Sequence, residues 1–163
     1  MILSRRFIFV VSLFTCTSFV AATEQEAREV FGAAVAGGLT FTSLRPVEDI
    51  GSSLLHFTKE GRLQFLDQLQ RSELIREVTT RNAELRTRVA PASVVVIKRL
   101  GSDGLAEFDL RMDVVVELRK CEGATCIPLG KEKRAQVSGM VVGLVTNGRP
   151  TWRVKQVTIA GLI

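Results

Sequence analysis

One strictly alternating stretch, from Leu105 to Arg119, constrains the fold more than any other feature of the chain. Side chains on a strand point alternately to its two faces, so a period of two predicts one long strand with a single dry face. That face must be covered by other parts of the chain, and whatever covers it defines the fold. The apolar positions are Phe108, Leu110, Met112, Val114, Val116 and Leu118, and charged residues fill most of the positions between them.

Segments in the first half of the chain carry apolar residues at the spacing of amphipathic helices. A capping box at 23–26 predicts the start of the first helix, and a glycine pair predicts its end. An extended link over 39–44 should follow, and then a second helix with Pro46 in its first turn. Thr58 and Ser72 are placed to cap a third and a fourth helix. The predicted buried stripes are Ala27, Val30, Phe31, Ala34 and Val35; Val47, Ile50, Leu54 and Leu55; Phe65, Leu66 and Leu69; and Leu74, Ile75 and Val78.

The period changes to two from Asn82 onward. Trp152 and Val154 have one parity and Val157 and Ile159 the other, which predicts a bulge near 155–156 in the last strand. Helices followed by strands indicate a single α+β domain, in which N-terminal helices pack on a curved antiparallel sheet. Strands are predicted from Leu85 up to Pro91, over 94–100, 105–119, 135–146 and 151–159, with turns at 101–104 and 147–150.

The N-terminus has the pattern of an export signal. An uncharged apolar run from Phe7 to Ala22 follows Arg5 and Arg6 and ends in small residues. We expect residues 1–22 to be a signal peptide cut near Thr23, which leaves residues 23–163 as one exported domain. The run has 16 residues, short of the roughly 20 that span a bilayer, so a retained inner-membrane anchor is the less favoured alternative.

The charge balance does not indicate nucleic-acid binding. The chain has 22 Lys and Arg residues against 17 Asp and Glu, and removal of residues 1–22 deletes two arginines and no acid. The remaining excess is small and interleaved with acids, which is typical of a solvated surface.

Two cysteines, Cys121 and Cys126, remain after the predicted cleavage, in a polar loop beyond the long strand. In an oxidising compartment they are expected to form a disulfide across the loop. A metal site is the competing interpretation. It needs more ligands than this loop supplies, and the single histidine, His56, is distant in sequence. We therefore expect no metal and no cofactor.

Catalysis finds little support in the sequence. His56 would need a polar partner to act as a general base, and Asp49 and Asp67 are the conceivable ones, yet nothing in their spacing singles them out. Nucleophile-elbow, dinucleotide-binding and phosphate-loop motifs are absent from the sequence. We expect no catalytic residues, and we expect Trp152 to pack in the core instead of anchoring an interface.

The segment from His56 to Ser72 resembles the DotI/IcmL family of type IVB secretion proteins, which is related to the conjugation protein TraM. The matching positions are Phe57, Thr58, Gly61, Phe65, Leu69 and Ser72. The resemblance implies a nuclear-transport-factor-like cone of helices on a curved sheet, and it carries over no catalytic residue.

The resemblance also implies a non-enzymatic, periplasmic structural or interaction component of a secretion or conjugation apparatus. Its partners would be other envelope proteins, or further copies of the chain, with exposed sheet positions such as Arg111 and Glu117 in contact with them. The alternative hypothesis is an exported cone domain that binds or transforms a small molecule. The apolar positions of the long strand count against it, because such a pocket needs polar side chains. A protein that leaves the producing cell is a third hypothesis.

Overall fold

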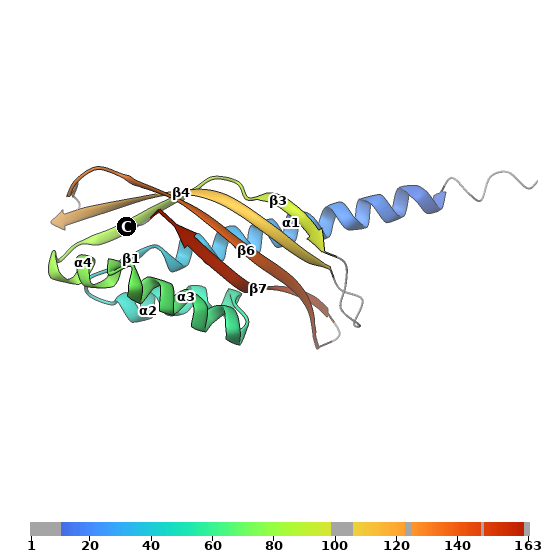
Figure 1. Ribbon diagram of the computed structural model, residues 1–163, viewed down its shortest axis with the longest axis horizontal. Helices are drawn as coiled ribbons and strands as arrows, with labels where there is room; N and C mark the ends of the chain where they lie inside the picture. Colours follow the sequence, from blue (N-terminus) through green and yellow to red (C-terminus); the bar gives the residue numbers. More distant parts are fainter. Residues whose placement is uncertain (1–10, 99–105, 123–124, 148, 162–163) are drawn as a thin grey trace, which may run out of the picture.

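The computed structural model describes residues 11–98, 106–122, 125–147 and 149–161 (Figure 1). The turn predicted at 101–104 lies outside these residues. Within them the helices are α1 (Val11–Gly38), α2 (Pro46–Ser53), the short 3-10 helix η1 (Leu54–His56), α3 (Lys59–Arg71) and α4 (Leu74–Thr80). The strands are β1 (Phe41–Thr42), β2 (Glu84–Val89), β3 (Ser93–Lys98), β4 (Glu107–Glu122), β5 (Thr125–Pro128), β6 (Lys133–Thr146) and β7 (Arg149–Ala160).

The helices lie on one face of a curved antiparallel sheet, which confirms the predicted α+β architecture (Figure 1). The strand order is β1-β2-β4-β6-β7, and β3 and β5 also pair with β4. The long alternating strand is thus the centre of the sheet. β2 and β3 follow each other along one side of β4, and β6 and β5 follow each other along the opposite side.

The dry face of β4 is buried as its pattern predicts. Phe108, Leu110, Met112, Val114 and Val116 are all buried. The C-terminal half of α1 covers this face with its own buried stripe, and α3 and α4 extend the same core. Members of the core on the helices include Ala27, Phe31, Ala34, Val35, Ile50, Phe65, Leu69, Leu74 and Val78.

Trp152 joins α1 to the last strand. Its side chain is only 6% exposed, its ring packs against Phe108 with centroids 5.4 Å apart, and its indole N–H donates to Glu26 Oε2 at 3.0 Å. The predicted core position of Trp152 is therefore confirmed. The hydrogen bond also fixes the position of α1 along the β6–β7 hairpin.

The last hairpin follows its sequence signals. Met140 pairs with Gln156 and Val141 pairs with Val154, so the extra residue on β7 is Lys155. This is the predicted bulge, and it lets Trp152, Val154 and Val157 all reach the core. At the other end, Thr146 pairs with Arg149 across a two-residue turn, in which Asn147 has a φ of 53°. Positive φ is what such hairpin turns require.

Several local predictions were wrong. α1 does not begin at the capping box. It runs unbroken from Val11 through Thr23, because residues 11–22 contain no glycine or proline to end it. The segment 39–44 is not only a link, since it contains β1, which pairs with β2.

The second and fourth helices also differ in detail from their predictions. Val47 and Leu55, which were predicted to lie on a buried stripe, are largely exposed, and the buried residues of α2 are Ile50 and Ser53. The N-cap of α4 is Glu73, in a left-handed conformation, whereas Ser72 ends α3. None of the described helices combines the length and the apolarity that crossing a membrane requires.

Candidate functional site

The segment that resembles the DotI/IcmL family attaches α3 to the edge strand β7. Thr58 N donates to the Val154 carbonyl at 2.9 Å, and Thr58 Oγ1 accepts from Gly61 N at 3.1 Å, so one residue both caps α3 and holds it to the sheet. Gly61 permits the close approach: a Cβ at this position would lie 2.2 Å from Val154 O. Phe57 and Phe65 stack beside this contact with ring centroids 5.0 Å apart.

Side chains of α3 also satisfy the exposed backbone edge of β7. The Gln68 amide donates to the Val157 carbonyl at 2.5 Å and accepts from Ile159 N at 2.7 Å, in the manner of a neighbouring strand. Gln64 Oε1 accepts from Val157 N at 3.4 Å. An unpaired strand edge is a site of unwanted pairing between chains, so α3 protects this edge. No local sequence pattern predicts the role of these glutamines, since their partners are about ninety residues away.

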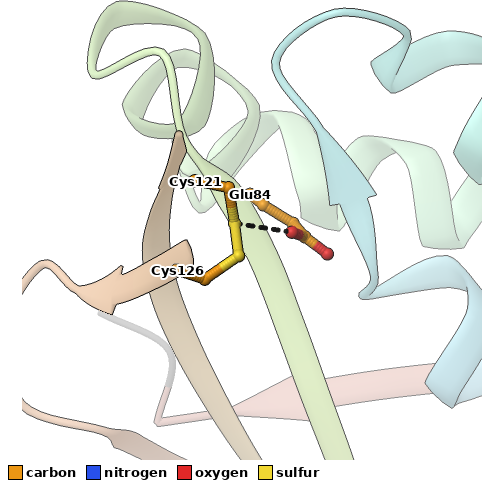
Figure 2. Close-up of side chains that lie close together, drawn as sticks. All are labelled: Glu84, Cys121 and Cys126. Atoms are coloured by element: carbon orange, nitrogen blue, oxygen red, sulfur yellow. Dashed lines mark hydrogen bonds between the residues drawn. A yellow bond between two sulfur atoms is a disulfide. The ribbon is translucent and has the colours of Figure 1, made fainter. Parts of the chain in front are cut away.

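A disulfide connects β4 and β5. Cys121 and Cys126 are cross-strand partners with Cα atoms 4.1 Å apart, and the structure bonds their sulfur atoms (Figure 2). Both cysteines lie on strands, Cys121 on β4 and Cys126 on β5, whereas the sequence predicted that both would lie in a loop beyond the long strand. Both cysteines are half-buried.

Glu84 on β2 lies beside this disulfide, a neighbour that the sequence analysis missed (Figure 2). Its Oε2 is 3.3 Å from Cys121 Sγ. A disulfide sulfur carries no proton, so this contact is a hydrogen bond only when Cys121 is a reduced thiol. Glu84, Cys121 and Cys126 are residue types that can ligate a metal ion, and their potential ligand atoms lie close together. In the disulfide neither sulfur is a thiolate, the form that binds a metal.

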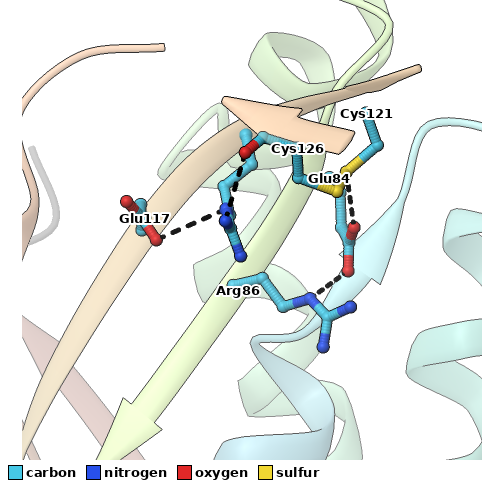
Figure 3. Close-up of a disulfide and its surroundings, with 6 residues drawn as sticks. Glu84, Arg86, Glu117, Cys121 and Cys126 are labelled. Carbon is cyan, nitrogen blue, oxygen red and sulfur yellow. Dashed lines mark hydrogen bonds and ion pairs between the residues drawn. A yellow bond between two sulfur atoms is a disulfide. The ribbon is translucent and has the colours of Figure 1, made fainter. Parts of the chain in front are cut away.

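Charged side chains surround the disulfide on the outer face of the sheet (Figure 3). Arg86 forms an ion pair with Glu84, and Arg119 Nε lies 3.6 Å from Glu117 Oε2. Arg119 Nη2 also donates to the Cys126 carbonyl at 3.3 Å, so a guanidinium group bridges β4 and β5. These charged residues alternate with buried residues along β2 and β4. Their contacts link side chains on the outer face at this end of the sheet.

The outer face of the sheet is polar and hollowed by open depressions. One of about 330 Å³ is lined by the side chains of Asp109, Arg111, Ser138, Met140, Gln156 and Thr158, together with neighbouring backbone. Two other depressions lie on either side of Val115. One is lined by Arg134 and Gln136, and the other by Arg86 and Arg88. Both residues lie on this face, and Arg111 is exposed as predicted, whereas Glu117, which was also predicted to be exposed, is half-buried beside Arg119. The side chains that line these depressions are mixed in charge.

The structure does not assemble a catalytic group around His56. Asp67 is bonded to Arg71 through both carboxylate oxygens, at 3.1 and 2.9 Å. Asp49 Oδ2 accepts from Thr42 N at 2.9 Å and from Thr42 Oγ1 at 2.8 Å. In the described part of the chain neither aspartate forms a hydrogen bond or ion pair with His56. Both carboxylates have structural partners instead.

Local hydrogen bonds lower the pKa values of two carboxyl groups, Asp49 and Glu60. The backbone N–H of Thr42, followed by its hydroxyl, lowers the pKa of Asp49 below its ordinary value. The Glu60 backbone N–H, followed by the Thr58 hydroxyl, lowers the pKa of Glu60. These groups stabilise helix starts, since a carboxylate near the positive end of a helix is favoured.

Comparison with known proteins identifies the architecture. No protein-family model and no curated protein sequence matches the chain. Among solved structures, a periplasmic fragment of TraM matches with a TM-score of 0.71 and 16% identity, over 85% of this chain and 97% of the fragment. The periplasmic domain of DotI matches with a TM-score of 0.68 and 15% identity, over 82% of this chain and 92% of the domain.

A third solved structure extends the comparison. An IcmL-like type IV secretion system protein from Legionella pneumophila matches with a TM-score of 0.63 and 11% identity, over 82% of this chain and 89% of that one. The chain shares the fold of these three proteins. The resemblance seen between His56 and Ser72 is thereby confirmed at the level of the fold. Identities this low carry the architecture and not the individual side chains.

Proposed function

We propose that this chain is a non-enzymatic, periplasmic structural component of a type IVB secretion or conjugation system, where it binds other envelope proteins. The observation that carries the proposal is the shared fold, which spans 85% of this chain and 97% of a periplasmic TraM fragment. The DotI domain, which is also periplasmic, supports the location, and the IcmL-like protein supports the type of apparatus. Residues 1–22 serve the export of the domain.

The packing of the inner face favours a scaffold over a ligand-binding cone. Every inward position of β4 from Phe108 to Val116 is apolar and buried against helices. A cone that binds a small polar molecule needs polar groups converging on a cavity at this face. The open depressions described above lie on the outer face, where Arg111 is exposed and Glu117 is half-buried. The outer face is therefore the proposed docking surface.

Affinity capture from native cells tests the proposal. The bait is the full chain with a C-terminal tag, extracted in mild detergent, and mass spectrometry identifies both the bound proteins and the N-terminus of the bait. Recovery of secretion-channel subunits is expected. Capture of the bait alone contradicts the proposal of a stable subunit. An N-terminus at Thr23 indicates a cleaved signal, and a longer one indicates a retained segment.

Variants locate the docking surface. Charge reversal of Arg111→Glu or Glu117→Lys should reduce the recovered partners, because these side chains lie on the outer face. His56→Ala is the matched control and should leave recovery unchanged. A folded His56→Ala protein that loses function would instead favour the enzymatic or ligand-binding alternative.

A further inference from the structure

The segment from Leu44 to Leu55 gathers exposed apolar side chains in one place. Leu44 is 84% exposed, Val47 is 78% exposed and Leu55 is 69% exposed, and these are the three most exposed large apolar side chains among the residues that the structure describes. They lie on α2, on the bend that precedes it and on the 3-10 helix η1 that follows it. Single apolar side chains on a surface are ordinary, whereas a group of them in one short segment marks a contact with another molecule.

The fold of the chain does not use these side chains. α2 packs on α1 through Ile50 and Ser53, which are its buried residues. The contact is close, because a Cβ on Gly37 of α1 would lie 3.0 Å from the Cβ of Ser53. Val47 and Leu55 are left on the exposed side of α2. Since the helices cover the inner face of the sheet, this apolar segment and the outer face of the sheet lie on opposite sides of the molecule (Figure 1).

Val47, Gly51 and Leu55 form a row with a notch at its centre. Residues four apart lie along one ridge of a helix surface, and such ridges pack into the grooves of a second helix. Gly51 has no side chain, and a Cβ there would meet no other atom within 4 Å. One apolar side chain thus lies four residues to either side of the notch. A row with this arrangement is complementary to itself, because a two-fold axis at Gly51 places Val47 of one copy opposite Leu55 of the other.

The end of the row near Val47 carries a negative charge. Glu48 is exposed, and within the described part of the chain its carboxylate forms no hydrogen bond or ion pair. Two hydrogen bonds from Thr42, and to a smaller extent the charge of Arg45, lower the pKa of Asp49. The charges of Arg45 and Asp49 thus offset each other, and the charge of Glu48 is left over.

The end of the row near Leu55 carries a positive charge. Arg62 Nη2 donates to the Leu54 carbonyl at 3.3 Å, which holds the guanidinium at this end of the row. Among the described residues this guanidinium forms no ion pair. An antiparallel pair of rows brings Glu48 of each copy to Arg62 of the other, whereas a parallel pair places like charges together. The apolar side chains and the charges therefore favour the same partner, a second copy of the chain in antiparallel orientation.

We propose that two copies of the chain associate through this row, with their α2 helices antiparallel and the two Gly51 residues at a two-fold axis. The same patch serves both copies, so each contact of Val47 with Leu55 and each pair of Glu48 with Arg62 occurs twice. The outer faces of the two sheets stay free and point away from each other. A dimer therefore presents two copies of the proposed docking surface, which strengthens binding to an assembly that has repeated sites.

Disulfide trapping of Gly51→Cys tests the two-fold axis. The protein is purified from native cells with its C-terminal tag, in mild detergent. Every variant also carries Cys16→Ser, which leaves the Cys121–Cys126 disulfide as the other cysteine chemistry. Oxidation with copper phenanthroline should link Gly51→Cys into a covalent dimer, because the two Cα atoms at the axis lie within the range of a disulfide.

The matched control for trapping is Val145→Cys in the same background. Val145 is 62% exposed at the end of β6, on a different side of the molecule from α2. This variant should form no covalent dimer. Equal linking of the two variants would overturn the proposal.

Charge reversal tests the antiparallel orientation. Glu48→Arg and Arg62→Glu should each raise the dimer dissociation constant by about tenfold, because each change places like charges together at two points of the interface. The double variant should return the constant to near its wild-type value, since the pair is then reversed and not lost. Sedimentation equilibrium measures the constant, and circular dichroism confirms that each variant is folded. A double variant that dimerises no better than the single variants would contradict the arrangement, and a wild-type protein that is monomeric at every concentration would overturn the proposal.

The apolar row distinguishes a second copy from other occupants. Val47→Asp should raise the dimer dissociation constant by at least about tenfold, because two buried valines are replaced at once. Val145→Asp should leave it unchanged. A monomeric wild type whose captured channel subunits are lost in Val47→Asp would assign the row to a partner protein and would overturn the proposal. Self-association does not rest on the proposed function, since sedimentation requires no secretion subunit and capture of channel subunits requires no dimer.

Discussion

The two faces of the central sheet obey different constraints. Along β4 the inner residue Val114 is fully buried, whereas its neighbour Val115 lies on the outer face opposite Arg88 and Arg134. The inner face tolerates only apolar side chains of fitting volume, because helices pack directly on it. The outer face holds ion pairs in contact with water, which contribute little to stability. The fold therefore depends on one face, and the other is free to carry a binding surface.

The largest expected difference in stability is between two variants of β4, one with a charge on the inner face and one with a charge on the outer face. Val114→Asp buries an unpaired carboxylate and should cost more than about 4 kcal/mol of unfolding free energy, enough to prevent folding. Val115→Asp should change stability by less than about 1 kcal/mol, because two arginines flank it. Urea unfolding followed by circular dichroism measures both. Similar losses in the two variants would contradict the comparison.

Two glycines provide a second contrast on the helical side. Gly61→Ala should cost about 2 to 3 kcal/mol, because its Cβ would collide with the Val154 backbone. Gly51→Ala has open space around the new Cβ and should stabilise α2 by about 0.5 kcal/mol. Thermal unfolding of each variant is the measurement. A neutral Gly61→Ala would mean that α3 does not approach β7 so closely.

The disulfide on the outer face should contribute moderately to the free energy of unfolding. Cys121→Ser with Cys126→Ser should lower the unfolding free energy by about 2 kcal/mol, the value expected for closing so small a loop. A reducing agent should lower wild-type stability to the level of this double variant and leave the variant unchanged. An undiminished stability in reducing agent would show that the strands hold β5 without the covalent bond.

The smallest expected effect is the acid dependence of Asp49. Its pKa is lowered in the folded state, so its contribution is present above the ordinary value of 3.8 and is lost as the pH falls through the folded value. The stability difference between wild type and Asp49→Asn should shrink between neutral pH and pH below 3.8. Thr42→Val removes only the hydroxyl and should give a partial effect. A pH-independent difference would contradict this assignment.

Much of the fold followed from patterns local in the sequence. The alternation from Phe108 to Leu118, the cap at Thr58 and the parity change around Lys155 each predicted a feature that the structure contains. The errors were at places where a local signal competed with a neighbouring segment. The capping box at Thr23 was overridden because an apolar stretch without helix breakers precedes it, and of the predicted stripe on α2 Ile50 is buried and Val47 is exposed.

The sequence by itself determined most of the buried positions and the order of helices before strands, because strand and helix periods are properties of adjacent residues. Only the tertiary structure decided which distant groups meet. Glu84 lies beside Cys121, Gln68 completes the edge of β7, and Trp152 binds Glu26 across 126 residues of chain. Such contacts depend on the twist and register of the sheet, which no single segment encodes.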